Sequence, residues 1–166
     1  MDNHKKTKVP IWHYIFLPLI VVVLHLIVSL VFYFHLSDSI AYHFIGDGTP
    51  DRWMGKNALI GGALILQLAI LVITTVILVA ARRKALTDAS GVLKDNSAKI
   101  LYFIGSMPVF LQVVISFVIM DIFSYNVYQK HLFPLWLFVI IVLVLATVVF
   151  TVFFVFMAKS IIKQSE

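Results

Sequence analysis

The chain has 166 residues and a net charge of +5, with 61% of its residues apolar and only 13% charged. A water-soluble domain of this length could not cover so much apolar surface, because its outside must face water. The absence of cysteine excludes disulfides, thiolate metal sites and thiol nucleophiles. We therefore expect one integral membrane domain over residues 1–166, located in the cell membrane.

Four apolar runs are each long enough for a membrane-spanning helix, which needs about 20 residues. Backbone amides in hydrocarbon must pair internally, so a helix is the expected spanning form. The predicted fold is an all-α four-helix bundle with helices at about 11–34, 50–81, 100–125 and 134–158. Pro18 and Pro108 are expected to bend the first and third helices.

Lysine and arginine are concentrated on one side of the predicted bundle. With four spans, the two tails and the middle loop share a side, and they hold Lys5, Lys6, Lys8, Arg82, Arg83, Lys84, Lys94, Lys99, Lys159 and Lys163. The other side holds Arg52, Lys56 and Lys130. This imbalance predicts cytoplasmic termini and a cytoplasmic middle loop. The basic residues flank apolar runs and form no nucleic-acid motif, so we expect the lipid bilayer as a partner and no nucleic acid.

The first external loop, residues 36–56, differs in composition from the apolar runs around it. Gly48 follows an aspartate, Asp47, in a typical turn dipeptide. Thr49 suits a helix N-cap and Pro50 the first helical position, so the second helix is predicted to begin at Pro50. Arg52 is expected to contact Asp38, Asp47 or a lipid phosphate. We interpret this loop as the extracytoplasmic functional element.

The spacing of residues in this loop resembles a short membrane domain of unknown function. The residues that carry the resemblance are Leu36, Ile40, His43, Phe44, Gly48, Pro50, Asp51, Arg52, Trp53 and Lys56. Ser37 and Ala41 stand where that domain usually has prolines. The domain is best known from the N-terminal part of SdpI-type bacteriocin-immunity proteins of Gram-positive bacteria. The resemblance implies protection against a secreted peptide toxin and, in some systems, membrane sequestration of a cytoplasmic repressor.

The polar residues of the loop allow two interpretations. His43, Gly48, Pro50, Asp51, Arg52, Trp53 and Lys56 either organise the ends of the first two helices or form a surface that binds an external peptide, lipid headgroup or ion. No metal site is expected, because His43, Asp47 and Asp51 lack the repeated histidine spacing of a zinc site.

Polar residues inside the apolar runs are the second candidate site. His25, Gln67, Gln112 and Thr147 are predicted to lie at similar depth and to form one hydrogen-bonded layer. Such a layer either holds the helices together or relays protons or substrate. Asp121, near the external end of the third helix, is predicted to pair with His35, Arg52 or Lys56.

Motifs for hydrolysis, phosphate binding and metalloprotease chemistry are absent from the sequence. We therefore expect a non-enzymatic protein without a cofactor that senses or neutralises an extracytoplasmic ligand. One alternative is a small transporter or permease accessory subunit, a homo-oligomer, that uses the polar layer. Another is a lipid-acting enzyme with His43 and Asp51. The middle loop is either a solvated connector or a dock for a cytoplasmic repressor or transporter partner.

Overall fold

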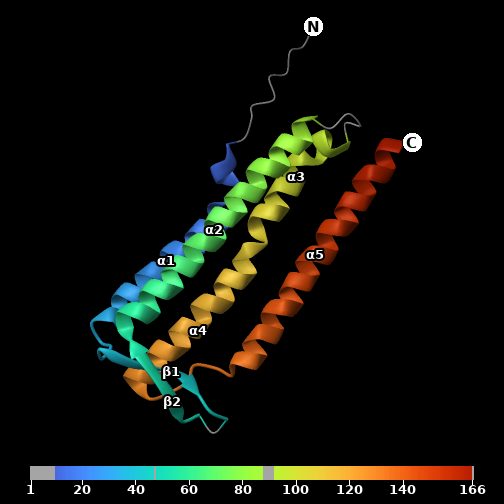
Figure 1. Cartoon of the computed structure of the whole chain (residues 1–166). Helices are drawn as coiled ribbons and strands as arrows, with labels where there is room; N and C mark the ends of the chain where they lie inside the picture. The colour runs from blue at the N-terminus through green and yellow to red at the C-terminus, as the bar shows by residue number, and fades with distance from the viewer. Residues whose placement is uncertain (1–9, 47, 88–91, 166) are drawn as a thin grey trace.

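The computed structural model describes residues 10–46, 48–87 and 92–165. Lys5, Lys6, Lys8 and Asp47 lie outside these ranges, and the side chains of Lys94 and Lys163 also lie outside the described part. The elements in chain order (Figure 1) are η1 (Ile11–His13), α1 (Phe16–Tyr33), β1 (Ser39–Phe44), β2 (Pro50–Gly55), α2 (Lys56–Thr87), α3 (Val92–Ser106), α4 (Pro108–Tyr128) and α5 (Leu135–Ser165).

Within the described residues, four helical stretches are long and apolar enough to cross a membrane, as the sequence predicted. They are Phe16–Tyr33, Lys56–Ala85, Ser97–Tyr128 and Leu135–Lys159. The third stretch is interrupted, because α3 ends at Ser106 and α4 begins at Pro108, whose nitrogen cannot donate a helical hydrogen bond. Pro18 lies in the first turn of α1, where its missing N–H leaves no helical carbonyl without a donor.

Residues 50–55 form a strand, so the prediction that the second helix begins at Pro50 is wrong. β1 and β2 pair antiparallel, with Ile40 opposite Met54 and Ala41 opposite Trp53. The Ile45 amide donates to the Thr49 carbonyl over 2.9 Å, and Gly48 adopts a φ of +85° in the turn. Pro50 is tolerated because it is the first residue of its strand. The fold is therefore mostly helical with one β-hairpin, and α2 begins at Lys56.

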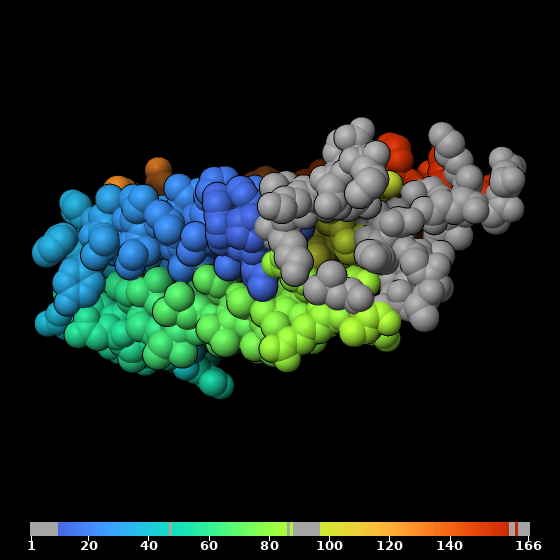
Figure 2. Space-filling model, turned by 90° about the horizontal axis from the view of Figure 1, so that it is seen from above, coloured from blue at the N-terminus to red at the C-terminus, as the bar shows by residue number. Residues whose placement is uncertain are grey.

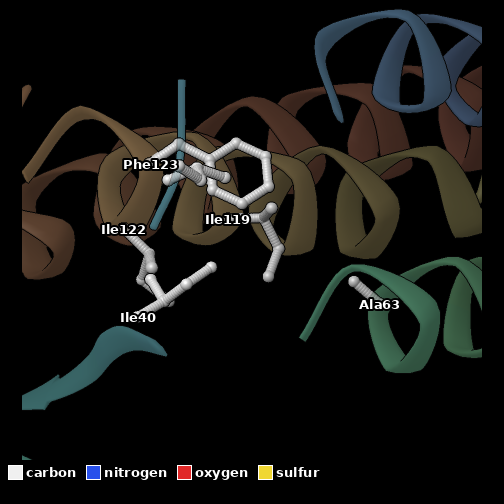
Figure 3. Close-up of a cluster of buried hydrophobic side chains, with 6 residues drawn as sticks. Ile40, Ala63, Ile119, Ile122 and Phe123 are labelled. Atoms are coloured by element: carbon white, nitrogen blue, oxygen red, sulfur yellow. The ribbon is translucent and has the colours of Figure 1, made fainter. Parts of the chain in front are cut away.

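The helices α1, α2 and α4 form the packed part of the bundle. α1 and α2 lie side by side along their lengths (Figures 1 and 2). One buried cluster joins α2 and α4 to the hairpin (Figure 3), and it consists of Leu36, Ile40, Ala63, Ile119, Ile122 and Phe123. Ile40 of β1 is completely buried in this cluster, so the hairpin is packed against the bundle.

The helix α5 is peripheral. Only 6% of the most apolar 18-residue segment of α5 is buried, whereas 22% of the corresponding segments of α1 and α2 is buried. Its contacts with the other helices include two stacked aromatic pairs, Phe117 with Phe138 and Phe103 with Phe153. We call the end with β1 and β2 the hairpin end (Figure 1). The opposite end, where the described basic residues Arg82, Arg83, Lys84, Lys99 and Lys159 lie, is called the basic end.

A second buried cluster lies toward the basic end and consists of Tyr14, Leu78 and Leu101. Gly105 of α3 passes so close to the Tyr14 backbone that a Cβ at this position would collide with the Tyr14 carbonyl oxygen. Glycine at position 105 therefore allows the chain before α1 to pack this closely against α3.

Candidate functional site

The strand β1 is attached to α4 through the side-chain amide of Asn126. The Ala41 N–H donates to Asn126 Oδ1 over 2.9 Å, and Asn126 Nδ2 donates to the Ala41 carbonyl over 2.8 Å. Nδ2 also donates to the Ile122 carbonyl over 2.8 Å, which fixes the amide on its own helix. The amide therefore pairs with both backbone groups of Ala41 as a neighbouring strand would.

The base of the hairpin is closed by Lys56 at the start of α2. Its Nζ lies 3.1 Å from Asp38 Oδ1 and donates to the Leu36 carbonyl over 3.2 Å. The same ammonium lies 4.9 Å from the centre of the Tyr33 ring. Among the residues predicted for the site, Lys56 thus anchors the hairpin.

His43 and Asp51 form a pair across the two strands. His43 Nδ1 donates to Asp51 Oδ1 over 2.6 Å, and both side chains are exposed. The hydrogen bond from His43 lowers the pKa of Asp51 below its ordinary value, and the nearby charges of His43 and Arg52 act in the same direction. The carboxylate form of Asp51 is therefore favoured in the folded hairpin.

Asp121 of α4 holds the connection between α4 and α5, so its predicted pairing with His35, Arg52 or Lys56 is wrong. Asp121 Oδ2 lies 2.7 Å from His131 Nδ1, and Oδ1 accepts the Leu132 N–H over 2.7 Å. The chain reverses after α4 because Gln129 is left-handed, with a φ of 56°. This reversal brings His131 back to Asp121. Lys56 is engaged by Asp38 instead.

A groove of about 600 Å³ runs between the hairpin and the α4–α5 connection. His43, Phe44 and Ile45 line one wall, and the other wall contains Asp121, His131 and Phe133. The strand pairing is irregular between Ala41 and Phe44, which allows three consecutive residues of β1, Tyr42, His43 and Phe44, to line the same groove. The groove thus combines apolar walls with two imidazoles and a carboxylate.

An aromatic contact joins the two walls of the groove. The Phe44 ring meets the Tyr125 ring edge-on at 4.5 Å and the His131 ring at 4.7 Å between ring centres. These contacts and the Asn126 amide fix both walls relative to α4.

The remaining predicted hairpin residues have different positions. Gly48 lies in the turn and lines the groove, and Pro50 begins β2 opposite Phe44. Arg52 and Trp53 are exposed on β2, outside the set of residues that line the groove. Asp47, one predicted partner of Arg52, lies outside the described residues.

The predicted polar layer inside the bundle is formed by some of its expected members. Gln67 Nε2 donates to the Gln112 carbonyl over 3.2 Å and to Ser116 Oγ over 2.9 Å. Gln112 Nε2 lies 3.5 Å from the Gln67 carbonyl, so the two amides link α2 and α4 reciprocally. His25 is buried on α1 and lines a cavity of about 310 Å³ together with Ser116.

Thr147 does not belong to this layer. Its side chain is exposed on α5, and its hydroxyl donates to the Leu143 carbonyl of its own helix over 2.8 Å. The peripheral position of α5 turns this side of the helix away from the packed core. In the described part of the chain, no three His, Asp or Glu side chains are grouped as ligands for a metal ion.

Sequence reasoning missed Asn126 and His131, which connect the hairpin, α4 and the connection to α5. Asn126 offered one signal, a carboxamide close to the end of an apolar run, where an unpaired amide is costly. His131 offered none, because its role depends on the chain reversal at Gln129.

Comparison with protein families finds a match to a domain of unknown function (DUF1648) over residues 20–68. The matched segment contains most of α1, the whole hairpin and the first part of α2. No curated protein and no solved structure matches the chain. The family match therefore coincides with the hairpin and its two flanking helices, and it assigns them no activity.

Proposed function

We propose that the protein is inserted in the cell membrane with both termini in the cytoplasm. Its hairpin end then faces outward and recognises an extracytoplasmic ligand. The four apolar helices and the excess of lysine and arginine at the basic end support this orientation.

The observation that carries the proposal is the preorganised groove at the hairpin end. Both walls are fixed in the free protein, one by Ile40 and Asn126 and the other by Asp121. A ligand that binds a preformed groove does not have to order its walls, so this entropic cost of binding is avoided. A few polar groups at fixed positions then give selectivity. Apolar walls beside His43 and His131 suit a peptide, which offers apolar side chains and backbone hydrogen-bonding groups together.

The concrete form of this function is non-enzymatic immunity or signalling. The resemblance of residues 36–56 to SdpI-type immunity proteins supports a secreted peptide as the ligand. In such a system the basic end is the side on which a cytoplasmic repressor or transporter partner docks.

The test compares bacterial strains that lack the gene and carry either the wild-type protein, His43→Ala or His131→Ala. Each strain is challenged with concentrated culture supernatant of the parent strain, before and after protease treatment. We expect the deletion to sensitise cells to the protease-sensitive fraction and the wild-type protein to restore resistance. His43→Ala and His131→Ala, which each remove one imidazole of the groove, should fail to restore it at equal membrane abundance.

Thr147→Ala is the matched control, because Thr147 is exposed on α5 and hydrogen-bonds only within that helix in the described structure. This variant should restore resistance fully. Unchanged sensitivity of the deletion strain, or full rescue by both groove variants, contradicts the proposal.

A proton transporter is the second candidate, and buried polar atoms favour it. Four buried atoms lack a hydrogen-bond partner among the described residues: His25 Nε2, Ser29 Oγ, Gln67 Oε1 and Gln112 Oε1. Intramembrane polar groups are costly and often mark ion pathways. In proteoliposomes containing pyranine, this function requires an imposed pH gradient to collapse faster than in empty liposomes. His25→Phe must abolish the effect, and a rate equal to that of empty liposomes excludes it.

A further inference from the structure

A cleft of about 580 Å³ separates α5 from α1 and α3 on the side of the basic end. Leu17, Phe103, Val152, Phe153 and Phe156 contribute apolar surface to it. Phe103 stacks on Phe153 at 3.7 Å between ring centres and meets Phe150 edge-on at 5.2 Å. The aromatic pair joins α3 to α5 in the middle of an otherwise open apolar cleft.

Two lysines lie at the mouth of this cleft. Lys99 lines it and precedes Phe103 by four residues, so it lies one helical turn nearer the basic end on the same face of α3. Lys159 follows Phe156 by three residues on α5, which runs in the opposite direction. Lys159 therefore also lies on the basic side of the cleft. Both lysine side chains are exposed.

The charge around the mouth is positive. The acidic side chains that the structure describes, Asp38, Asp51 and Asp121, all belong to the hairpin end. In the sequence, the two tails and the middle loop together carry ten lysines and arginines against four acidic residues, so the basic end has a net positive charge.

We propose that this cleft binds an anionic phospholipid. The acyl chains lie against Phe103 and Phe153, and the phosphate lies between Lys99 and Lys159. A basic pocket between helices on the cytoplasmic side is the general form of such lipid sites, and each lysine near an anionic lipid contributes about five-fold in affinity. The site depends on membrane insertion as proposed above, and it is independent of ligand recognition by the hairpin.

Native mass spectrometry of the purified full-length protein in detergent tests this site. The probes are phosphatidylglycerol and phosphatidylcholine with identical acyl chains, added at equal concentration, and inorganic phosphate in a separate arm. We expect several-fold more bound phosphatidylglycerol than phosphatidylcholine. We also expect inorganic phosphate at the same concentration not to displace the lipid, because phosphate cannot fill the apolar cleft.

Variants separate the contribution of the lipid headgroup to affinity from that of the acyl chains. The double variant Lys99→Gln/Lys159→Gln should lose the preference for phosphatidylglycerol by roughly 5- to 25-fold, at about five-fold per lysine. Arg83→Gln removes an exposed charge at the same end that does not line the cleft, so it should keep most of the preference. Val149→Phe narrows the cleft and should weaken both lipids.

Three results overturn the proposal. They are equal binding of the two lipids by the wild-type protein, a preference unchanged in the double lysine variant, and displacement of phosphatidylglycerol by an equal concentration of inorganic phosphate. The lysine substitutions are on exposed positions and leave the apolar contacts in place, so the test does not depend on whether Val149→Phe folds.

Discussion

The hairpin end and the basic end of the bundle are built from different interactions. At the hairpin end, Ile40 is buried between α2 and α4, and the Asn126 amide pairs with the backbone of β1. At the basic end, an apolar cleft separates α5 from α3, with Lys99 in its lining and Lys159 one helical turn beyond Phe156. The arrangement at the hairpin end fixes the positions of the side chains that line the groove, which suits selective recognition of one ligand. The cleft at the basic end supplies apolar surface and positive charge without fixing the direction of hydrogen bonds, which suits binding of a class of lipids.

The largest expected effect comes from truncating the buried anchor of the hairpin. Ile40→Ala should lower the free energy of unfolding by about 2–5 kcal/mol, because a fully buried side chain leaves a cavity. Ile45→Ala, in the same hairpin but 47% exposed, should cost far less. Denaturant unfolding in detergent measures both, and equal losses would show that the hairpin does not pack against the bundle.

The second prediction concerns the connection between α4 and α5. Asp121→Ala removes the acceptor for His131 and for the Leu132 amide, and should cost about 1–3 kcal/mol. Asp121→Asn keeps an oxygen for the Leu132 amide and should cost less. Thermal unfolding of the two variants measures the difference. A larger loss for Asn than for Ala would be inconsistent with Asp121 acting mainly through these hydrogen bonds.

A smaller effect is expected between α2 and α4, midway between the two ends. Gln67→Leu removes the hydrogen bonds to the Gln112 carbonyl and Ser116, and should cost about 0.6–2 kcal/mol. The double variant Gln67→Leu/Gln112→Leu should cost about the sum of the single variants, because each side-chain amide donates a separate hydrogen bond to the backbone carbonyl of the other residue. Unfolding experiments measure these losses, and no loss of stability in either single variant would argue against the reciprocal link.

The smallest effect is an acid dependence of the exposed hairpin. The pKa of Asp51 is lowered by its hydrogen bond from His43, so the pair stabilises the hairpin above the ordinary aspartate pKa. This contribution is lost as the pH falls below that value and through the lowered pKa. The protection of β2 amides from hydrogen exchange, taken relative to the intrinsic exchange rate at each pH, should therefore fall in acid for the wild-type protein. Asp51→Asn should remove this part of the pH dependence, and an identical profile in the variant would exclude the pair as its cause.

The helices could be predicted from the sequence because each depends on a local property, about 20 consecutive apolar residues. The hairpin was missed because Thr49 and Pro50 also satisfy the local rules for a helix start. The residues Ile40, Tyr42 and Phe44 do alternate with polar or small residues, a period of two that indicates a strand. Because residues 50–55 pair with β1 as a strand, they cannot form the first turns of the second helix.

The candidate site was predicted in part, for a similar reason. The sequence singled out His43 and Asp121, which line the groove, but it could not supply their partners correctly. The pairing of Asp121 with His131 depends on the chain reversal at Gln129, and that of Asn126 with Ala41 spans 85 residues. Thr147 was misplaced because depth along a helix does not determine which face meets the core.

Hydrogen exchange of the Ala41 amide tests most directly whether the hairpin is a fixed wall of the groove. In the wild-type protein this amide donates to Asn126 and should exchange far more slowly than the amides of the exposed turn. Asn126→Ala should raise its exchange rate by roughly 5- to 150-fold, as the loss of about 1–3 kcal/mol requires. Asn57→Ala, at an exposed position of α2, should leave the rate unchanged. An Ala41 amide that exchanges as fast as the turn in the wild-type protein would contradict the account.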